Sequence, residues 1–176
     1  ELKDYEADDI IGTFATKGEE NGFITTIVTG DRDLTQLASD KTTVEVTKSG
    51  VSQLEAYTPE HMKEVNGVTP TEFIDMKALM GDSSDNYPGV EGIGPKTASN
   101  LIQKYHTVEN LYDHIDDLKA SKRKERLIRD KHNAILGKKL ATIDRHSPVT
   151  IDIDDVKRQP IDYEKLRQFY EKMNFR

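Results

Sequence analysis

The sequence predicts an α/β portion followed by an all-α portion, within a chain of 176 residues. Two observations indicate this order. Up to Tyr57, short β-branched segments alternate with helical patterns, as in folds built around a parallel sheet. After Thr58 the apolar residues keep a helical spacing almost to the end of the chain. We therefore expect two regions, residues 1–57 and residues 58–176.

The α/β portion should contain two helices, a buried strand and a hairpin. The first helix begins near Glu6, with apolar residues at helical spacing behind it. Phe23–Thr29 is apolar or β-branched at nearly every position, which is typical of a parallel strand buried on both faces. Residues 34–38 are predicted to form a second helix, and residues 42–47 and 51–57 two strands around a turn at residues 48–50.

The second portion should consist of helices joined by loops. Thr58 and Thr69 can cap its first two helices, and Pro70 suits the first turn of the second. A glycine-rich loop is predicted at Gly81–Gly94, and the last helix should be amphipathic. The predicted helices cover residues 58–65, 70–80, 95–105, 108–115, 121–143 and 162–173, and residues 148–153 should be extended.

Composition excludes several classes of protein. The chain has no cysteine, so disulfides and thiolate metal sites are impossible, and its five histidines show no metal-ligand spacing, which argues against zinc. No apolar run is long enough to span a membrane, and no secretory signal opens the chain, so we expect a cytoplasmic location. The start at Glu1 suggests a fragment of a longer protein.

The charge distribution is uneven. The net charge is −7, but residues 119–145 hold ten Lys or Arg against three acids, a balance of +7 that leaves −14 for the rest. A basic helical stretch beside an acidic portion suits an enzyme that binds cations with carboxylates and DNA phosphates with Lys and Arg. A solvated helix face that happens to be basic explains the stretch equally well.

Three acidic clusters are the candidates for a metal site. They are residues 6–9, 31–33 and 82–85, and each alone could be an ordinary helix cap or turn. Asp31 and Asp33, however, directly follow the predicted strand, where open α/β sheets bind ligands. The other two clusters can reach the same edge. The carboxylates would repel one another unless divalent cations neutralised them, and oxygen ligands without Cys or His favour Mg²⁺ or Mn²⁺.

The segment Gly89–Ala98 carries the most specific signal. Gly92 and Gly94 allow a tight hairpin with exposed backbone N–H groups, and Pro95 suits the first turn of the next helix. Lys96 and Thr97 add a positive charge and a hydroxyl at that helix N-terminus, which already favours anions. This arrangement would hold a DNA phosphate without reading a base. The alternative is a generic linker between two helices.

Together these motifs resemble a known family. Residues 5–9, 29–37 and 81–86, with the glycine hairpin, resemble the 5′ nuclease (5′-3′ exonuclease) domain of bacterial DNA polymerase I and, more distantly, the flap endonucleases. The resemblance implies a PIN-like α/β core with a partial parallel sheet, here at residues 1–57. It also implies a helical DNA-binding region at 58–176, with a helix-hairpin-helix motif at about 74–105.

The resemblance also implies an activity and a site. The activity would be two-metal cleavage of 5′ ends and 5′ flaps of duplex DNA in replication and repair, with Mg²⁺ or Mn²⁺ as cofactor and a polymerase domain possible in the parent chain. Glu6 and Asp8 would serve the first metal, with Asp9 beside them, and Asp31, Asp33 and Asp85 the second, supported by Asp82. Gly92, Gly94, Lys96 and Thr97 would bind DNA, and carbonyls of Gly89, Val90 and Ile93 would hold a monovalent cation such as K⁺.

The chain departs from the family pattern at its start. The family has a longer segment before the first motif, which supplies further aspartates and central strands. Without it we expect an unpaired sheet edge and a weakly active or inactive fragment. Two other functions remain open on the sequence: a non-catalytic module that binds duplex DNA, and a different two-metal ribonuclease, against which the hairpin argues.

Overall fold

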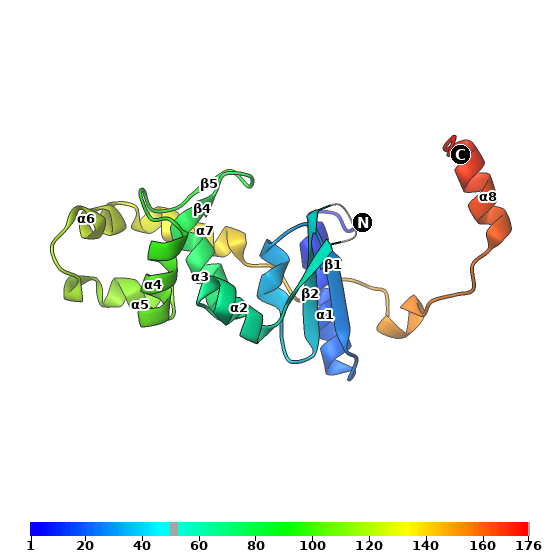
Figure 1. The fold of residues 1–176 in the computed structure, drawn as a ribbon, viewed down its shortest axis with the longest axis horizontal. Helices are drawn as coiled ribbons and strands as arrows, with labels where there is room; N and C mark the ends of the chain where they lie inside the picture. Colours follow the sequence, from blue (N-terminus) through cyan, green and yellow to red (C-terminus); the bar gives the residue numbers. More distant parts are fainter. Residues whose placement is uncertain (50–52, 176) are drawn as a thin grey trace.

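The computed structural model describes residues 1–49 and 53–175. Figure 1 shows three parts along the long axis. A group of helices lies at one end, a small sheet with its helix in the middle, and the C-terminal helix at the other end. An α/β part followed by a helical part is the order that the sequence predicts.

The α/β part is a three-stranded sheet with one long helix. Helix α1 (Ala7–Glu20) leads into strand β1 (Thr25–Thr29), followed by the 3-10 helix η1 (Asp33–Leu37) and by strands β2 (Thr42–Ser49) and β3 (Gln53–Tyr57). The strand order is β1-β2-β3; β1 runs parallel to β2, with Ile27 opposite Val44, and β3 is antiparallel to β2. Both the parallel pairing and the hairpin were predicted. Residue 50 of the predicted turn and residues 51–52 of the predicted second strand lie outside the described residues.

The prediction that β1 is buried on both faces is wrong. Ile27 is only 6% exposed, but its neighbour Val28 is 63% exposed. The physical reason is that successive side chains point to opposite faces and α1 packs against one face of β1, so Ile27 is covered and Val28 is not. The apolar residues Phe23 and Ile24 before it are also exposed. An unpaired edge, by contrast, agrees with the expectation from the sequence.

The helical part begins at the predicted cap residues. The side chains of Thr58 and Thr69 accept hydrogen bonds from backbone N–H groups at the starts of α2 (Pro59–Asn66) and α3 (Pro70–Met80). Two short strands then form a ladder, β4 (Gly81–Asp82) with β5 (Tyr87–Pro88). The remaining helices are α4 (Pro95–Tyr105), α5 (Val108–Asp113), η2 (Ile115–Asp117), α6 (Lys122–Arg129), α7 (Lys131–Ala141), η3 (Ile153–Val156) and α8 (Tyr163–Lys172).

Helix α3 is the centre of the packing. It contacts α4 and α7 in the helical part and η1 in the α/β part, so it joins the two parts around one apolar core. Asp75 on this helix is buried, and its Oδ1 accepts hydrogen bonds from Val108 N at 2.8 Å and from Lys138 Nζ at 2.8 Å. A buried carboxylate with two such partners fixes α3 against α5 and α7.

Two predicted elements differ from the structure. Residues 34–38 are mostly 3-10 helix, whereas residues 148–152, predicted to be extended, belong to no helix and lead into η3 at Ile153. The predicted helix at 121–143 is broken into α6 and α7 at Asp130. The carboxylate of Asp130 accepts hydrogen bonds from Arg129 and from the backbone N–H of Glu91, and these contacts hold the break in place.

Helix α8 lies apart from the rest of the molecule (Figure 1). The predicted helix is present, and its apolar residues Phe169, Tyr170 and Met173 are exposed. Phe169 and Tyr170 pack against each other and against Phe175, with ring centroids 5.8–6.3 Å apart. Among the described helices none is long and apolar enough to cross a bilayer. The cytoplasmic location stays a prediction.

Candidate metal centre and nucleic-acid interface

The fold brings the acidic clusters into one cleft of about 270 Å³. Glu6 caps α1, and Asp8 and Asp9 lie in its first turn. Asp31 and Asp33 follow the carboxyl end of β1, which is where a parallel strand presents ligands. Asp85 lies in the turn between β4 and β5. The cleft is lined by Glu6, Asp8, Asp9, Asp31, Asp33, Asp85, Tyr87, Leu140, Ala141, Thr142 and Ile143.

Three of the aspartates are close enough to share a cation. Carboxylate oxygens of Asp33, Asp82 and Asp85 lie within 4.8 Å of one another. Burial raises the pKa of Asp33, and burial also raises that of Asp8, as is usual for a carboxylate removed from water. An all-oxygen donor set of this kind fits Mg²⁺ or Mn²⁺ better than zinc.

Lys77, a residue that the sequence analysis did not single out, lies among these carboxylates. Its Nζ is 2.9 Å from Oδ1 of Asp33 and also bonds to Oδ2 of Asp82. Burial lowers the pKa of Lys77, but its bonds to Asp82 and Asp33 outweigh burial and raise that pKa overall. Hydrogen bonds from Lys77 and Ser84 hold the pKa of Asp82 far below its usual range. The ammonium group of Lys77 is therefore a positive charge supplied by the protein itself among these carboxylates.

Two of the predicted site residues have clear structural duties. Oδ1 of Asp9 accepts a hydrogen bond from Asp144 N at 2.8 Å, and its Oδ2 accepts one from Glu6 N at 3.2 Å. Asp82 accepts the backbone N–H of Ser84 at 2.7 Å, which shapes the turn between β4 and β5. Asp9 thus joins the start of α1 to the segment after α7, and Asp82 orders the turn that carries Asp85.

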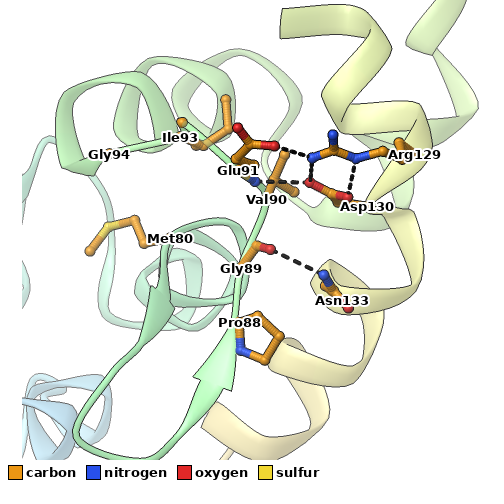
Figure 2. A pocket seen from close by; sticks show the side chains of 11 residues that line it. Met80, Pro88, Gly89, Val90, Glu91, Ile93, Gly94, Arg129, Asp130 and Asn133 are labelled. Carbon is orange, nitrogen blue, oxygen red and sulfur yellow. Dashed lines mark hydrogen bonds and ion pairs between the residues drawn. The ribbon is translucent and has the colours of Figure 1, made fainter.

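The glycine hairpin lies between β5 and α4 and borders a surface pocket of about 650 Å³ (Figure 2). Gly92 has a φ of 72°, which favours glycine, and Gly94 precedes Pro95 at the start of α4. Lys96 is exposed at that helix N-terminus, and Thr97 is half-buried. The structure thus presents the backbone and the side chains that were predicted to meet a phosphate.

The predicted monovalent-cation carbonyls are partly engaged. Gly89 O accepts a hydrogen bond from Asn133 Nδ2 at 3.4 Å, and Val90 O accepts one from Ile93 N at 3.1 Å. Each carbonyl oxygen keeps a second lone pair. All three predicted residues line the hairpin pocket.

Part of the basic stretch is neutralised within the protein. Arg129 reaches Glu91 at 2.5 Å and Asp130 at 2.7 Å, and Arg126 reaches Glu91 at 3.3 Å (Figure 2 shows the contacts of Arg129). Outside these pairs, the exposed basic residues of the stretch include Lys119, Lys122, Arg123, Lys131 and Lys139. The exposed basic charge of this stretch that is free of these pairs is therefore smaller than the sequence total of +7 suggests.

Comparison with known proteins identifies the family of the chain. Residues 1–67 match the model of the 5′-3′ exonuclease, N-terminal resolvase-like domain, and residues 68–164 match that of the 5′-3′ exonuclease, C-terminal SAM fold. The chain therefore belongs to the 5′-3′ exonuclease family. The boundary at Tyr57 predicted from the sequence stays a prediction.

Among curated relatives the chain is similar to bacterial DNA polymerase I. It is 49% identical to that of Streptococcus pneumoniae strain R6 over 100% of its own length, and 47% identical to that of Bacillus subtilis over 99%. In both cases it spans only 20% of the relative. These matches confirm the family resemblance drawn from the motifs.

Solved structures agree on the fold. A structure of the bacteriophage T5 5′-exonuclease matches with a TM-score of 0.71 at 26% identity, over 82% of this chain and 57% of that chain. A T5 5′-exonuclease structure with bound zinc ions matches with a TM-score of 0.72 at 25% identity, over 81% of this chain and 52% of that one. The α/β fold followed by a helical region is thus confirmed.

Proposed function

We propose that this chain is part of a structure-specific 5′ nuclease that hydrolyses phosphodiester bonds at 5′ ends and 5′ flaps of DNA. The observation that carries the proposal is the convergence of six carboxylates from three separate segments on one cleft. Structural roles account for Asp9 and Asp82, and Asp31 accepts a hydrogen bond from Asp33 N, but Asp8, Asp31, Asp33 and Asp85 still line one cleft, where their charges repel one another. Divalent cations would offset this repulsion.

The cleft and the hairpin are arranged for one substrate. Helix α7 borders both, since Asn133 lines the hairpin pocket and Leu140 lines the cleft. Seven residues of α-helix separate the two, which corresponds to about 10 Å, or about three base pairs of duplex DNA. A duplex held at its backbone by Gly92, Gly94, Lys96 and Thr97 could therefore place a phosphodiester of the same strand near the carboxylates.

The proposed roles divide the carboxylates between two cation sites. Glu6 and Asp8, with Asp9 beside them, would hold one Mg²⁺ or Mn²⁺, and Asp31, Asp33 and Asp85 the other, while Asp82 orients its turn. Two such cations supply an activated water and stabilise the leaving oxygen of an in-line displacement. K⁺ at Gly89, Val90 and Ile93, duplex DNA as the partner and a polymerase domain in the parent chain belong to the same proposal.

We further propose that the 176-residue chain on its own cleaves DNA weakly. The support is the described edge of the sheet, where β1 pairs only with β2 and leaves Val28 exposed. Carboxylates placed by an edge strand are less firmly held than those placed by a central strand, and catalysis depends on their position. The expected rate is therefore low even where metal binds.

A second function is favoured by one specific observation. Lys77 already pairs with Asp33 and Asp82 and offsets part of the negative charge at the cleft without metal. On that basis the chain would be a non-catalytic module that binds duplex DNA through the hairpin and the exposed basic residues of α6 and α7.

Metal binding separates the two functions. The double variant D31N/D33N should lose Mn²⁺ binding, measured by calorimetry, while D40N, which changes an exposed aspartate outside the cleft, should bind like the parent chain. Cleavage of a 5′-flapped duplex with Mg²⁺ should fall in D31N/D33N as well. A parent chain that binds flapped duplex but no Mn²⁺ would leave the binding module as the function.

A further inference from the structure

Tyr87 carries a buried hydroxyl that the roles above do not use. The residue lies in β5 opposite Asp82, and it is only 6% exposed. Its Oη has no hydrogen-bond partner among the described residues. Tyr87 nevertheless lines the acidic cleft, next to carboxylates of Asp33 and Asp85. A buried polar atom without a partner beside a ligand cleft requires an explanation, because such an atom normally costs stability.

The cleft has a shortage of hydrogen-bond donors. Six of its lining side chains are carboxylates, which only accept when ionised, and three are aliphatic. The hydroxyl of Thr142 donates to Lys138 O at 2.6 Å and is already engaged. Among the described side chains that line the cleft, the phenol of Tyr87 is therefore the donor that remains for a ligand.

The hydroxyl is a suitable donor for an anionic ligand. A phenol carries one O–H donor, whereas an ionised carboxylate has none. A neutral O–H can donate to a negatively charged oxygen that cations bring into the cleft.

The ring of Tyr87 is packed within the protein. A Cβ at Gly137 on α7 would lie in ordinary contact with it, 3.4 Å from Cδ2 of Tyr87. The β4–β5 ladder, in which Tyr87 pairs with Asp82, holds the backbone. The residue is thus in place before any ligand arrives, as a preorganised contact must be.

We infer that Tyr87 is a phosphate-binding residue, whose hydroxyl donates a hydrogen bond to a non-bridging oxygen of the phosphodiester held in the cleft. The inference rests on the proposed nuclease function, and it adds a neutral donor to a site otherwise composed of carboxylates and cations. The hydroxyl has a hydrogen-bond partner only when a phosphate is bound, which explains why it has none among the described residues.

The variant Y87F isolates the hydroxyl, because it keeps the ring and its packing. We expect Y87F to unfold at the same temperature as the parent chain or a higher one, since removing an unpaired buried polar group is neutral or favourable. Mn²⁺ affinity should not change. The affinity of the Mg²⁺-saturated chain for thymidine 5′-monophosphate, followed by phosphorus NMR, should fall about tenfold, as for a lost hydrogen bond to a charged acceptor.

Each alternative outcome has a definite meaning. Unchanged affinity for thymidine 5′-monophosphate in Y87F would overturn the role of Tyr87 and show that solvent satisfies the hydroxyl. A lower unfolding temperature would also overturn it, because the hydroxyl would then have a structural partner. A parent chain that binds no Mn²⁺ would reject the nuclease function, and the role of Tyr87 with it. If the parent chain binds both metal and nucleotide and Y87F binds them with the same affinities, the role of Tyr87 is rejected and the nuclease function is not. The matched control is Y163F, which removes an exposed hydroxyl on α8 and should leave both affinities unchanged.

Discussion

The ammonium nitrogen of Lys77 lies 2.9 Å from Oδ1 of Asp33 and also bonds to Asp82, so a lysine stands between two carboxylates of the candidate metal centre. Its side chain is only 11% exposed. A positive charge at this position satisfies the aspartates without an ion, and it also competes with any ion for the same oxygens. Binding of a cation by Asp33 should therefore depend on how firmly Lys77 holds it.

Replacing Lys77 by methionine should lower the stability of the metal-free protein and raise its affinity for metal. Breaking a buried ion pair on one side leaves an uncompensated charge and costs roughly 3–5 kcal/mol of unfolding free energy. Mn²⁺ can then take the place of the lost ammonium group. Thermal unfolding with and without Mn²⁺ should show that the metal raises the unfolding temperature more in K77M than in the parent chain.

The control for this change is K165M, which removes an exposed lysine of α8 that pairs with Asp162. It should shift neither the unfolding temperature nor the effect of Mn²⁺. Equal stabilisation of K77M and the parent chain by Mn²⁺ would show that Lys77 does not compete with metal.

Asp9 should act mainly as a structural residue. Its two oxygens accept the backbone N–H groups of Glu6 and Asp144. We expect D9A to lower the unfolding free energy by about 1–2 kcal/mol, the range for a lost helix cap with a second backbone contact. Chemical denaturation measures this loss. Calorimetry should show a smaller drop in Mn²⁺ affinity for D9A than for D33N. A larger drop for D9A would mean that Asp9 is mainly a metal ligand.

Two glycines near the hairpin should respond very differently to alanine. A Cβ at Gly89 would lie 2.3 Å from the backbone nitrogen of Gly81, whereas one at Gly94 would meet no atom within 4 Å. We expect G89A to lose roughly 3 kcal/mol or more, because two backbones must separate. G94A should change stability by less than about 1 kcal/mol. Denaturant midpoints of the two variants test this contrast, and similar losses in both would contradict the close approach at Gly89.

His61 should make stability depend on pH. A hydrogen bond to Glu55 raises the pKa of His61 above its usual 6.5, and the bond from His61 holds the pKa of Glu55 at about 2. A raised histidine pKa stabilises the fold fully below pH 6.5, and this contribution is lost as pH rises through the folded-state pKa. The depressed pKa of Glu55 stabilises the fold above its usual 4.5, and that contribution is lost as pH falls towards 2.

Unfolding temperatures between pH 5.5 and 8.5 should therefore fall more steeply for the parent chain than for H61Q. H132Q, which changes an exposed histidine on α7, should keep the parent profile. Parallel profiles for H61Q and the parent chain would mean that the contact with Glu55 does not contribute.

Much of the site was predictable because its residues follow local rules. Asp31 and Asp33 follow a strand, Glu6 precedes a helix, and Asp85 lies in a turn, so sequence position alone indicates which part of the fold carries each carboxylate. The glycine hairpin and its following helix are equally local. These are features that a short stretch of chain determines by itself.

The missed residues depend on contacts between distant segments. Lys77 lies between the apolar residues Met76 and Ala78 of α3, and a buried lysine requires an acidic partner, which is the signal that could have revealed it. Tyr87 gave no such signal. The break at Asp130 depends on Glu91, which is far away in the chain, and the exposure of Val28 depends on what covers the sheet rather than on the strand's own residues.

The cleft joins distant parts of the chain. Its walls include the first turn of α1 and residues at the end of α7 and just after it, and the bond between Asp9 and Asp144 joins residues 135 positions apart. Gln36 connects the same parts by bonding to Ala141 O and Ile143 N. Closing a long loop costs entropy that the contacts must offset. Metal binding at this cleft therefore requires the beginning of the chain and the end of α7 to be packed together, and neither half of the chain can provide the centre alone.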